Sequence, residues 1–160
     1  MSSRIAISAT VNGELVEREV EPRLLLADFI RHELSLHGTH VGCEQGVCGM
    51  CTVLVDGQPI KSCLMLTPQA DGRSISTVES LAPGDELHPL QQAFKSAHAL
   101  QCGYYTPAFL MTAYALGERG VALTRETIRE ELAGVLCRCT GYEHIFDAVE
   151  RYLAERGGKR

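Results

Sequence analysis

The chain has 160 residues, enough for one domain or two small ones. Its formal net charge of −5 argues against a nucleic-acid partner and against an anionic membrane. Seven cysteines, an odd number with no apolar secretion signal ahead of them, favour metal ligation over disulfides. We therefore expect a cytoplasmic protein that binds neither nucleic acid nor membrane.

Residues 1–80 are predicted to form a small α+β domain. Asn12-Gly13 and Asp56-Gly57 each lie between two alternating apolar and polar runs, the strongest local signal for a β-hairpin. Apolar residues at helical spacing predict a helix between the two hairpins. In chain order, the predicted elements are strands 4–10 and 14–20, a helix over 24–34, strands 52–55 and 58–61, and a last strand over 74–78.

Four cysteines with the spacing C-x4-C-x2-C-x11-C follow the predicted helix. They are Cys43, Cys48, Cys51 and Cys63. This spacing is typical of plant-type ferredoxins, in which four thiolates hold a [2Fe–2S] cluster. The alternatives are a zinc site or cysteines without a metal, but structural zinc usually takes its ligands as two closely spaced pairs. The spacing therefore predicts a centre that accepts and passes single electrons.

Three glycines are interspersed with the first three of these cysteines. Gly42, Gly46 and Gly49 remove side chains where the backbone has to wrap around an inorganic core, and glycine tolerates positive φ. We expect the loop to turn several backbone N–H groups toward the thiolates, which stabilises the anionic core.

Residues 85–156 are predicted to form a second, helical domain. A linker over 82–85 separates it from the first, and 157–160 reads as a tail. Thr106 is expected to cap one helix with Pro107 in its first turn, and Thr124 to cap the next. The predicted helices cover 88–99, 106–119, 124–133 and 142–155.

The remaining three cysteines lie in this helical half. Cys102 precedes one predicted helix, and Cys137 and Cys139 precede another; thiols two residues apart cannot share a helical face. Helix N-termini favour negative charge, so this arrangement suits an anionic cluster. The alternative is that the three are small buried apolar residues.

Together, the two cysteine groups resemble a known family. A C-x4-C-x2-C-x11-C domain followed by Gln101-Cys102-Gly103 and by Cys-Arg-Cys-Thr-Gly-Tyr over 137–142 is similar to the small iron–sulfur subunit of the xanthine oxidase family of molybdenum hydroxylases. The resemblance implies a β-grasp ferredoxin-like domain and a four-helix domain, each with one [2Fe–2S] cluster. It also implies that Gln101 lies near a molybdopterin on a large partner subunit, with FAD on a medium subunit of a hetero-oligomer.

One position departs from the family pattern. Tyr105 stands where the family has its fourth cysteine ligand, and no eighth cysteine replaces it. Three outcomes are open: a cluster with an unusual ligand, a labile or partial cluster, or no cluster. We expect a cluster held by Cys102, Cys137 and Cys139, with its fourth ligand unassigned. Tyr104 and Tyr105 could instead pack at a subunit interface.

The resemblance implies an electron-transfer subunit of an oxidoreductase, which carries electrons from the molybdopterin centre to FAD or an external acceptor. No catalytic acid, base or nucleophile is expected on this chain, because the chemistry belongs to the cofactors. Two other functions stay open. One is a free-standing ferredoxin with a helical appendage, and the other is a subunit whose helical domain has no cluster and only clamps its partner.

Overall fold

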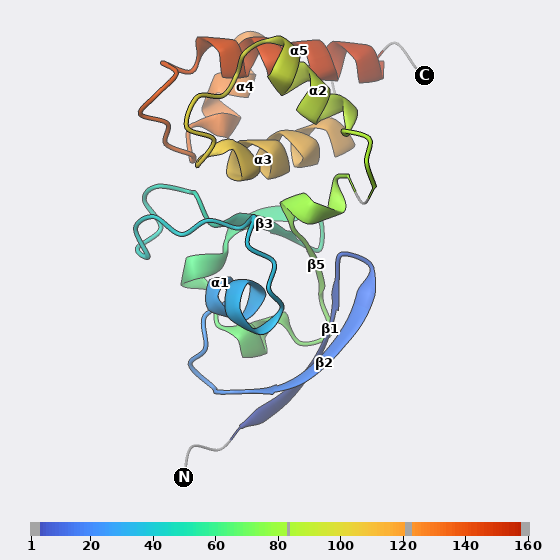
Figure 1. The fold of residues 1–160 in the computed structure, drawn as a ribbon, viewed down its shortest axis with the longest axis vertical. Coiled ribbons are helices and arrows are strands. Elements are labelled where there is room, and N and C mark those ends of the chain that lie inside the picture. Colours follow the sequence, from blue (N-terminus) through green and yellow to red (C-terminus); the bar gives the residue numbers. More distant parts are fainter. Residues whose placement is uncertain (1–3, 83, 121–122, 158–160) are drawn as a thin grey trace.

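A computed structural model describes residues 4–82, 84–120 and 123–157, which fold into a sheet-containing part and a helical part (Figure 1). The amino-terminal part holds a five-stranded mixed sheet, and four helices of the carboxyl-terminal part lie over one side of it. The predicted α+β fold is thereby confirmed. In the described part of the chain, no helix is both apolar and long enough to cross a membrane.

The sheet has the strand order β2-β1-β5-β3-β4. β1 and β5 run parallel, and the other neighbouring pairs run antiparallel. Both predicted hairpin turns are confirmed, with Asn12-Gly13 and Asp56-Gly57 in the left-handed region. The strands are β1 (Ile5–Val11), β2 (Glu14–Val20), β3 (Thr52–Val55), β4 (Gln58–Lys61) and β5 (Ser74–Ser76). β5 ends two residues earlier than predicted, because 78–80 form a 3-10 turn, η4 (Val78–Ser80).

One helical segment packs on the sheet and completes the first core. It begins as α1 (Leu26–Asp28) and continues as a π-helical turn, η1 (Phe29–Glu33). The wider turn is seen in the hydrogen bond from the Leu34 N–H to the Phe29 carbonyl, five residues back, at 3.1 Å. The helix predicted over 24–34 is thus present, but most of it is π-helical and not α-helical. Two short 3-10 turns follow later, η2 (Ser62–Leu64) and η3 (Thr67–Ala70).

The helical part contains the four predicted helices with shifted ends. They are α2 (Pro89–Ser96), α3 (Thr106–Glu118), α4 (Arg125–Leu132) and α5 (Glu143–Gly157). Thr124 caps α4 as predicted, since its hydroxyl accepts the Thr127 N–H at 3.2 Å. The prediction that Thr106 caps α3 is wrong: Thr106 is the first helical residue, and Tyr105 holds the cap position without a side-chain hydrogen bond.

Two predicted segments reach beyond the described residues. Pro83 of the predicted linker and residues 158–160 of the predicted tail lie outside them. Gly157, placed in the tail by the sequence, is the last residue of α5.

β3 joins the two parts, because it is buried on both faces. Leu54 packs into the core formed by α2 to α5, whereas Val53 and Val55 pack into the core around α1. Figure 1 shows α3 lying along β3. The sheet and the helices therefore share one continuous packed contact, and this contact fixes the positions of the two cysteine groups.

Candidate metal centres

The first group of cysteines is held by the loop 43–51 and by η2. Cys51 and Cys63 are buried, and Cys43 and Cys48 are half-buried. Contacts from a backbone N–H to a sulfur link these four cysteines in two pairs. The Cys48 N–H points to the Cys43 sulfur at 3.3 Å, and the Cys63 N–H points to the Cys51 sulfur at 3.4 Å.

The loop backbone makes one of these thiols unusually acidic. N–H groups of Cys48 and Gln45 hold the pKa of Cys43 down at about 6. Burial, followed by the neighbouring Cys51, raises the pKa of Cys63 to about 11. Backbone donors favour the thiolate at the open side of the site, and burial opposes it at the closed side.

The glycines of the loop act as predicted, in two different ways. Gly46 and Gly49 have φ of +79° and +72°, values that glycine tolerates best. Gly42 has no positive φ, but a Cβ there would lie 3.2 Å from the Cys48 sulfur. Gly42 therefore leaves room for a ligand, while the other two allow the loop to turn.

Paired thiols fit a two-iron cluster better than a single zinc ion. Among the described residues, no three His, Cys, Asp or Glu side chains are arranged to hold one metal ion. In a [2Fe–2S] cluster each iron takes two thiolates, and the backbone-to-sulfur contacts pair Cys43 with Cys48 and Cys51 with Cys63. The residues present therefore fit a [2Fe–2S] cluster.

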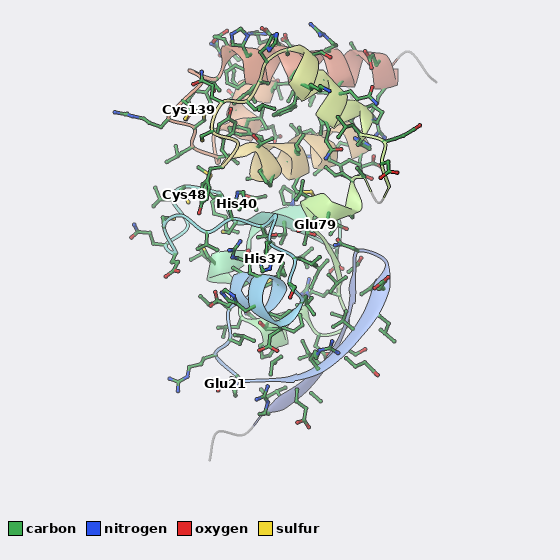
Figure 2. All side chains as sticks on the ribbon, in the orientation of Figure 1. Glu21, His37, His40, Cys48, Glu79 and Cys139 are labelled. Atoms are coloured by element: carbon green, nitrogen blue, oxygen red, sulfur yellow. The ribbon has the colours of Figure 1, made fainter. Side chains whose placement is uncertain are left out.

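The second group of cysteines lies at the amino-terminal ends of α3 and α5. Cys102 and Cys139 are exposed, and their sulfurs lie 3.5 Å apart. Cys137 is buried, and its sulfur is contacted by the Cys139 N–H at 3.4 Å. Figure 2 shows Cys139 and Cys48 at the same side of the molecule, on the helical and the sheet part respectively.

Tyr105, at the position where the family has a fourth cysteine, is buried. Its side chain is only 1 % exposed, so the alternative of packing at a subunit interface is wrong for Tyr105. Its hydroxyl donates to the Ala99 carbonyl at 3.1 Å. The Thr140 hydroxyl is 3.2 Å from the Cys137 sulfur, a contact that sequence reasoning missed. Cys102 and Cys139 thus lie as a pair of thiols, and the group beside the Cys137 sulfur is the Thr140 hydroxyl, so the three thiols could hold a cluster only with a further ligand.

The two cysteine loops touch each other directly. The Leu136 N–H donates to the Cys48 carbonyl at 2.9 Å. Leu136 directly precedes Cys137 of the second group, and Cys48 belongs to the first. Gly49 faces Gly134 so closely that a Cβ at position 49 would lie 2.1 Å from the Gly134 oxygen. Lys61 donates to the same oxygen at 3.2 Å.

A second bridge between the two parts was also missed in the sequence. The rings of His40 and Tyr104 stack at 4.5 Å, the His40 Nδ1 lies 2.7 Å from the Tyr104 carbonyl, and the Tyr104 hydroxyl donates to the Val41 carbonyl at 2.7 Å. The only available signal was that both residues lie within three positions of a cysteine. Figure 2 places His40 between the sheet and the helices.

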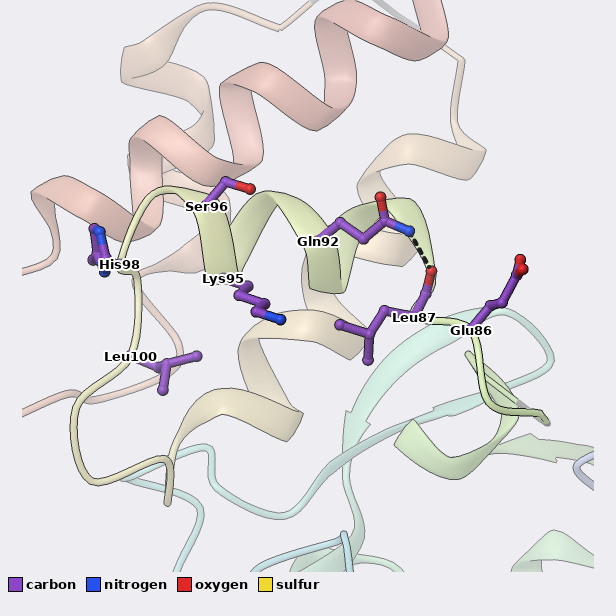
Figure 3. A pocket seen from close by; sticks show the side chains of 7 residues that line it. All are labelled: Glu86, Leu87, Gln92, Lys95, Ser96, His98 and Leu100. Atoms are coloured by element: carbon purple, nitrogen blue, oxygen red, sulfur yellow. Dashed lines mark hydrogen bonds between the residues drawn. The ribbon is translucent and has the colours of Figure 1, made fainter.

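Two further features lie on the surface of the helical part. Gln101 is exposed beside the exposed Cys102. A groove of about 970 Å³ runs along α2 (Figure 3), and one hydrogen bond, from the Gln92 side chain to the Leu87 carbonyl, crosses its wall. Its lining contains no cysteine, so it is separate from both centres; the lining residues are Glu86, Leu87, Gln92, Lys95, Ser96, His98 and Leu100.

Two protein-family models match the chain. The model described as a 2Fe-2S iron–sulfur cluster binding domain matches residues 9–79, and the model described as a [2Fe-2S] binding domain matches residues 77–150. Between them they include all seven cysteines.

Characterised relatives and one solved structure are similar over nearly the whole chain. Caffeine dehydrogenase subunit gamma from Pseudomonas sp. (strain CBB1) is 56 % identical over 153 residues, covering 94 % of this chain and 91 % of that protein. Nicotine 6-hydroxylase small subunit from Paenarthrobacter nicotinovorans is 51 % identical, covering 99 % and 95 %. A chain in the crystal structure of quinoline 2-oxidoreductase from Pseudomonas putida 86 superimposes with a TM-score of 0.92 at 49 % identity, covering 99 % and 98 %.

Proposed function

This chain belongs to the small [2Fe–2S] subunits of the xanthine oxidase family of molybdenum hydroxylases, and from that premise we propose that it relays electrons from the molybdopterin centre of a large subunit to FAD or an external acceptor. It is the iron–sulfur subunit of an oxidoreductase complex. The substrate is converted on another chain, because the reaction chemistry belongs to cofactors held there.

In this proposal, each domain holds one cluster, which supplies one-electron transfer when bound. The first is held by thiols of the ferredoxin-like domain, and the second by three thiols of the helical domain with its fourth ligand unassigned. The proposed ligands are Cys43, Cys48, Cys51 and Cys63 for the first, and Cys102, Cys137 and Cys139 for the second.

The observation that carries the proposal is the direct contact between the two cysteine loops. The Cys48 carbonyl accepts the N–H of Leu136, whose neighbour in the chain is Cys137. A thiol of the first group is therefore connected to a thiol of the second through covalent bonds and one hydrogen bond. A free-standing ferredoxin has no need of such a connection.

The residues exposed around the two cysteine groups support a different partner subunit for each centre. Gln101 and the exposed thiols Cys102 and Cys139 belong to the helical domain, and we assign to them the face that meets the molybdopterin subunit. Val47 and Leu64 are apolar, more than 60 % exposed, and flank the first group. We assign this second face to the FAD subunit or the external acceptor.

The compounds on which the relatives act support a substrate class. Caffeine, nicotine and quinoline are all N-heterocycles. We propose that the complex oxidises a compound of this class, using oxygen derived from water. The residues that choose among such compounds belong to the large subunit.

One other function is favoured by a specific observation. Tyr105 replaces a ligand, which would fit a helical domain that has lost its cluster and only clamps the large subunit. Electrons would then have to reach the first centre from the pterin over a longer gap, and turnover would be slow.

The test uses the complex purified with its native partners. Caffeine, nicotine, quinoline and a simple aldehyde are mixed with it anaerobically, and rapid-freeze EPR follows the reduced clusters. The proposal expects a molybdopterin subunit to copurify and the first-centre signal to appear within one turnover for at least one N-heterocycle. Copurification without reduction of the first centre by any substrate would overturn the relay.

A further inference from the structure

Lys61, the last residue of β4, places a positive charge beside the first cysteine group. Across the β3–β4 ladder it pairs with Thr52, the residue that follows Cys51. Cys63 lies two residues further along the chain. The Lys61 side chain therefore starts between two of the proposed ligands of the first cluster.

The Lys61 head group ends on the segment that leads to the second cysteine group. Its ammonium donates to the Gly134 carbonyl at 3.2 Å, and a Cβ at position 134 would lie 3.3 Å from the same nitrogen. Gly49 of the first loop approaches this carbonyl from the other part of the molecule. Cys137 follows Gly134 by three residues. The ammonium is thus held where the two cysteine loops touch.

No carboxylate neutralises this charge within the part of the chain that the structure describes. The ion pairs found there do not include Lys61, whose head group bonds to a main-chain carbonyl instead. Lys61 is partly buried, and withdrawing a cation from water without an opposite charge costs free energy. Thiolates of the neighbouring cysteines would supply the opposite charge.

We propose that the Lys61 ammonium stabilises the reduced form of the first cluster and thereby favours electron transfer toward the first centre. The inference rests on the proposed function, because it needs a cluster at the first centre. Reduction adds one electron, with no bond formed or broken, so the charge of the centre becomes more negative by one unit. A nearby cation lowers the energy of the more negative state, and the reduction potential rises.

The charge should act more on the first centre than on the second. Ser62, the residue after Lys61, donates its N–H to the Cys51 carbonyl at 3.2 Å, which keeps the end of β4 against the first group. Lys61 reaches the second group only through Gly134. Because Coulomb interactions weaken with distance, we expect a smaller shift of potential at the second centre. The difference between the two shifts gives the transfer its direction.

The test measures the reduction potential of the first centre in the complex purified with its native partners. Lys61→Gln removes the charge but keeps a hydrogen-bond donor, and Lys61→Arg keeps the charge. Lys95→Gln is the matched control, because it removes a charge from the groove along α2, whose lining contains no cysteine. EPR follows the reduced centre during titration with dithionite and redox mediators, so the measurement needs no substrate.

The proposal expects Lys61→Gln to lower the equilibrium constant for reduction of the first centre by about threefold to tenfold. The tenfold limit corresponds to a potential lower by about 59 mV for one electron. Lys61→Arg and Lys95→Gln should each change the constant by less than about twofold. The proposal is wrong if Lys61→Gln has no larger effect than Lys95→Gln, or if Lys61→Arg lowers the constant as far as Lys61→Gln does.

A second measurement separates the charge of Lys61 from its contact with Gly134. Hydrogen exchange of the Leu136 amide reports on the junction of the two loops, because this N–H is bonded to the Cys48 carbonyl. We expect Lys61→Gln to lower the potential while the Leu136 amide stays protected. A lower potential with lost protection would mean that Lys61 acts by holding the loops together, which would overturn the proposal.

Lys61→Met, which keeps an unbranched side chain, replaces Lys61→Gln if that variant does not assemble. Failure of both variants to assemble would assign Lys61 a structural role and also overturn the proposal. Failure of the proposed function is seen separately, in a first centre that no substrate reduces or in the absence of a copurifying large subunit. A relay that works with an unchanged potential in Lys61→Gln would refute only the role of Lys61.

Discussion

Leu136 gives its backbone N–H to the carbonyl oxygen of Cys48 at 2.9 Å, and this bond ties the loop of one cysteine group to the loop of the other. It forms between main-chain atoms, so it does not depend on the identity of the Leu136 side chain, which is 45 % exposed. What it does require is a close approach of two backbones. Gly49 and Gly134 provide that approach.

The first prediction concerns this close approach. Gly49→Ala should destabilise the protein for two reasons: φ is +72°, and the added Cβ would lie 2.1 Å from the Gly134 oxygen. The left-handed backbone alone costs roughly 1–2 kcal/mol for a non-glycine residue. The overlap with backbone atoms adds to this cost, because neither loop can move without breaking the Leu136 bond. We expect the free energy of unfolding, measured with denaturant, to fall by more than about 2 kcal/mol.

Gly72→Ala is the matched control for that prediction. Gly72 has nearly the same φ, +73°, but nothing lies within 4 Å of its added Cβ. The free energy of unfolding of Gly72→Ala should therefore fall only by the backbone contribution, roughly 1–2 kcal/mol. Equal losses in the two variants would show that the contact with Gly134 contributes nothing to stability.

Local patterns predicted much of the fold for identifiable reasons. Asn12-Gly13 and Asp56-Gly57 specify their turns through their own tolerance of positive φ, and Thr124 caps a helix with its own hydroxyl. The π-helical turn at 29–33 could not be predicted in this way. Its hydrogen bonds differ by one residue from those of an α-helix, while the apolar spacing over such a short segment is almost the same.

In the two cysteine sites, too, local sequence predicted the residues and long-range contacts could not be predicted. The cysteine spacing revealed which residues could hold iron, because the ligands of a compact cluster must be close in sequence or return to one loop. The contact between Leu136 and Cys48 left no trace in the sequence, since it joins main-chain atoms 88 positions apart. Thr140 could have been found, because it follows Cys139 directly and carries a hydroxyl.

The second prediction concerns pH and His88, whose ring caps α2. Its Nδ1 accepts the Leu90 N–H at 3.2 Å, which requires an unprotonated nitrogen. Burial, followed by the charge of Arg156, lowers the pKa of His88 despite the opposing charge of Glu118. The unfolded chain therefore binds a proton more readily than the folded one. Stability should fall as pH drops below about 6.5, until the folded state is protonated as well.

His88→Asn separates this effect from the general acid sensitivity of the protein. Asparagine is a good capping residue and does not titrate. Thermal unfolding of both proteins between about pH 8 and pH 5 should show a steeper loss in the wild type. Parallel curves would mean that His88 is not a source of the pH dependence.

The third prediction concerns an ion-pair group that joins α4 to α5. The Arg125 guanidinium contacts Glu143 at 2.8 Å, Asp147 at 2.9 Å and also Glu150. Arg125, followed by Arg129, lowers the pKa of Glu143. This contribution to stability is present above the unfolded pKa of Glu143, about 4.3, and is lost as pH falls through the lower folded value.

Arg125→Met should accordingly lower the unfolding temperature more than Arg119→Met, because Arg119 pairs with the single carboxylate of Glu131. The measurement is calorimetry at neutral pH in low salt and in about 1 M NaCl, where the Debye length is about 3 Å. We expect the difference in unfolding temperature between the two variants to be smaller in high salt. A gap that salt leaves unchanged would indicate lost packing against Phe146, which Arg125 also covers.

The fourth prediction concerns removal of iron from the first centre. Residues 43–51 form neither helix nor strand; main-chain bonds tie Cys48 to Leu136 and Cys51 to Ser62, while 43–47 lie between side chains that a cluster would bridge. Ligand bonds would therefore be the main restraint on residues 43–47. Treatment with a chelator and a reductant should expose them to limited proteolysis, with mass spectrometry placing the new cuts between 43 and 47. The Asp56-Gly57 turn, closed by the β3–β4 ladder, is the internal control and should stay uncut.

If the loop is digested equally with and without iron, the cluster is not what orders it. If it resists digestion in both states, the contacts with Gly134 and Leu136 are sufficient to hold it.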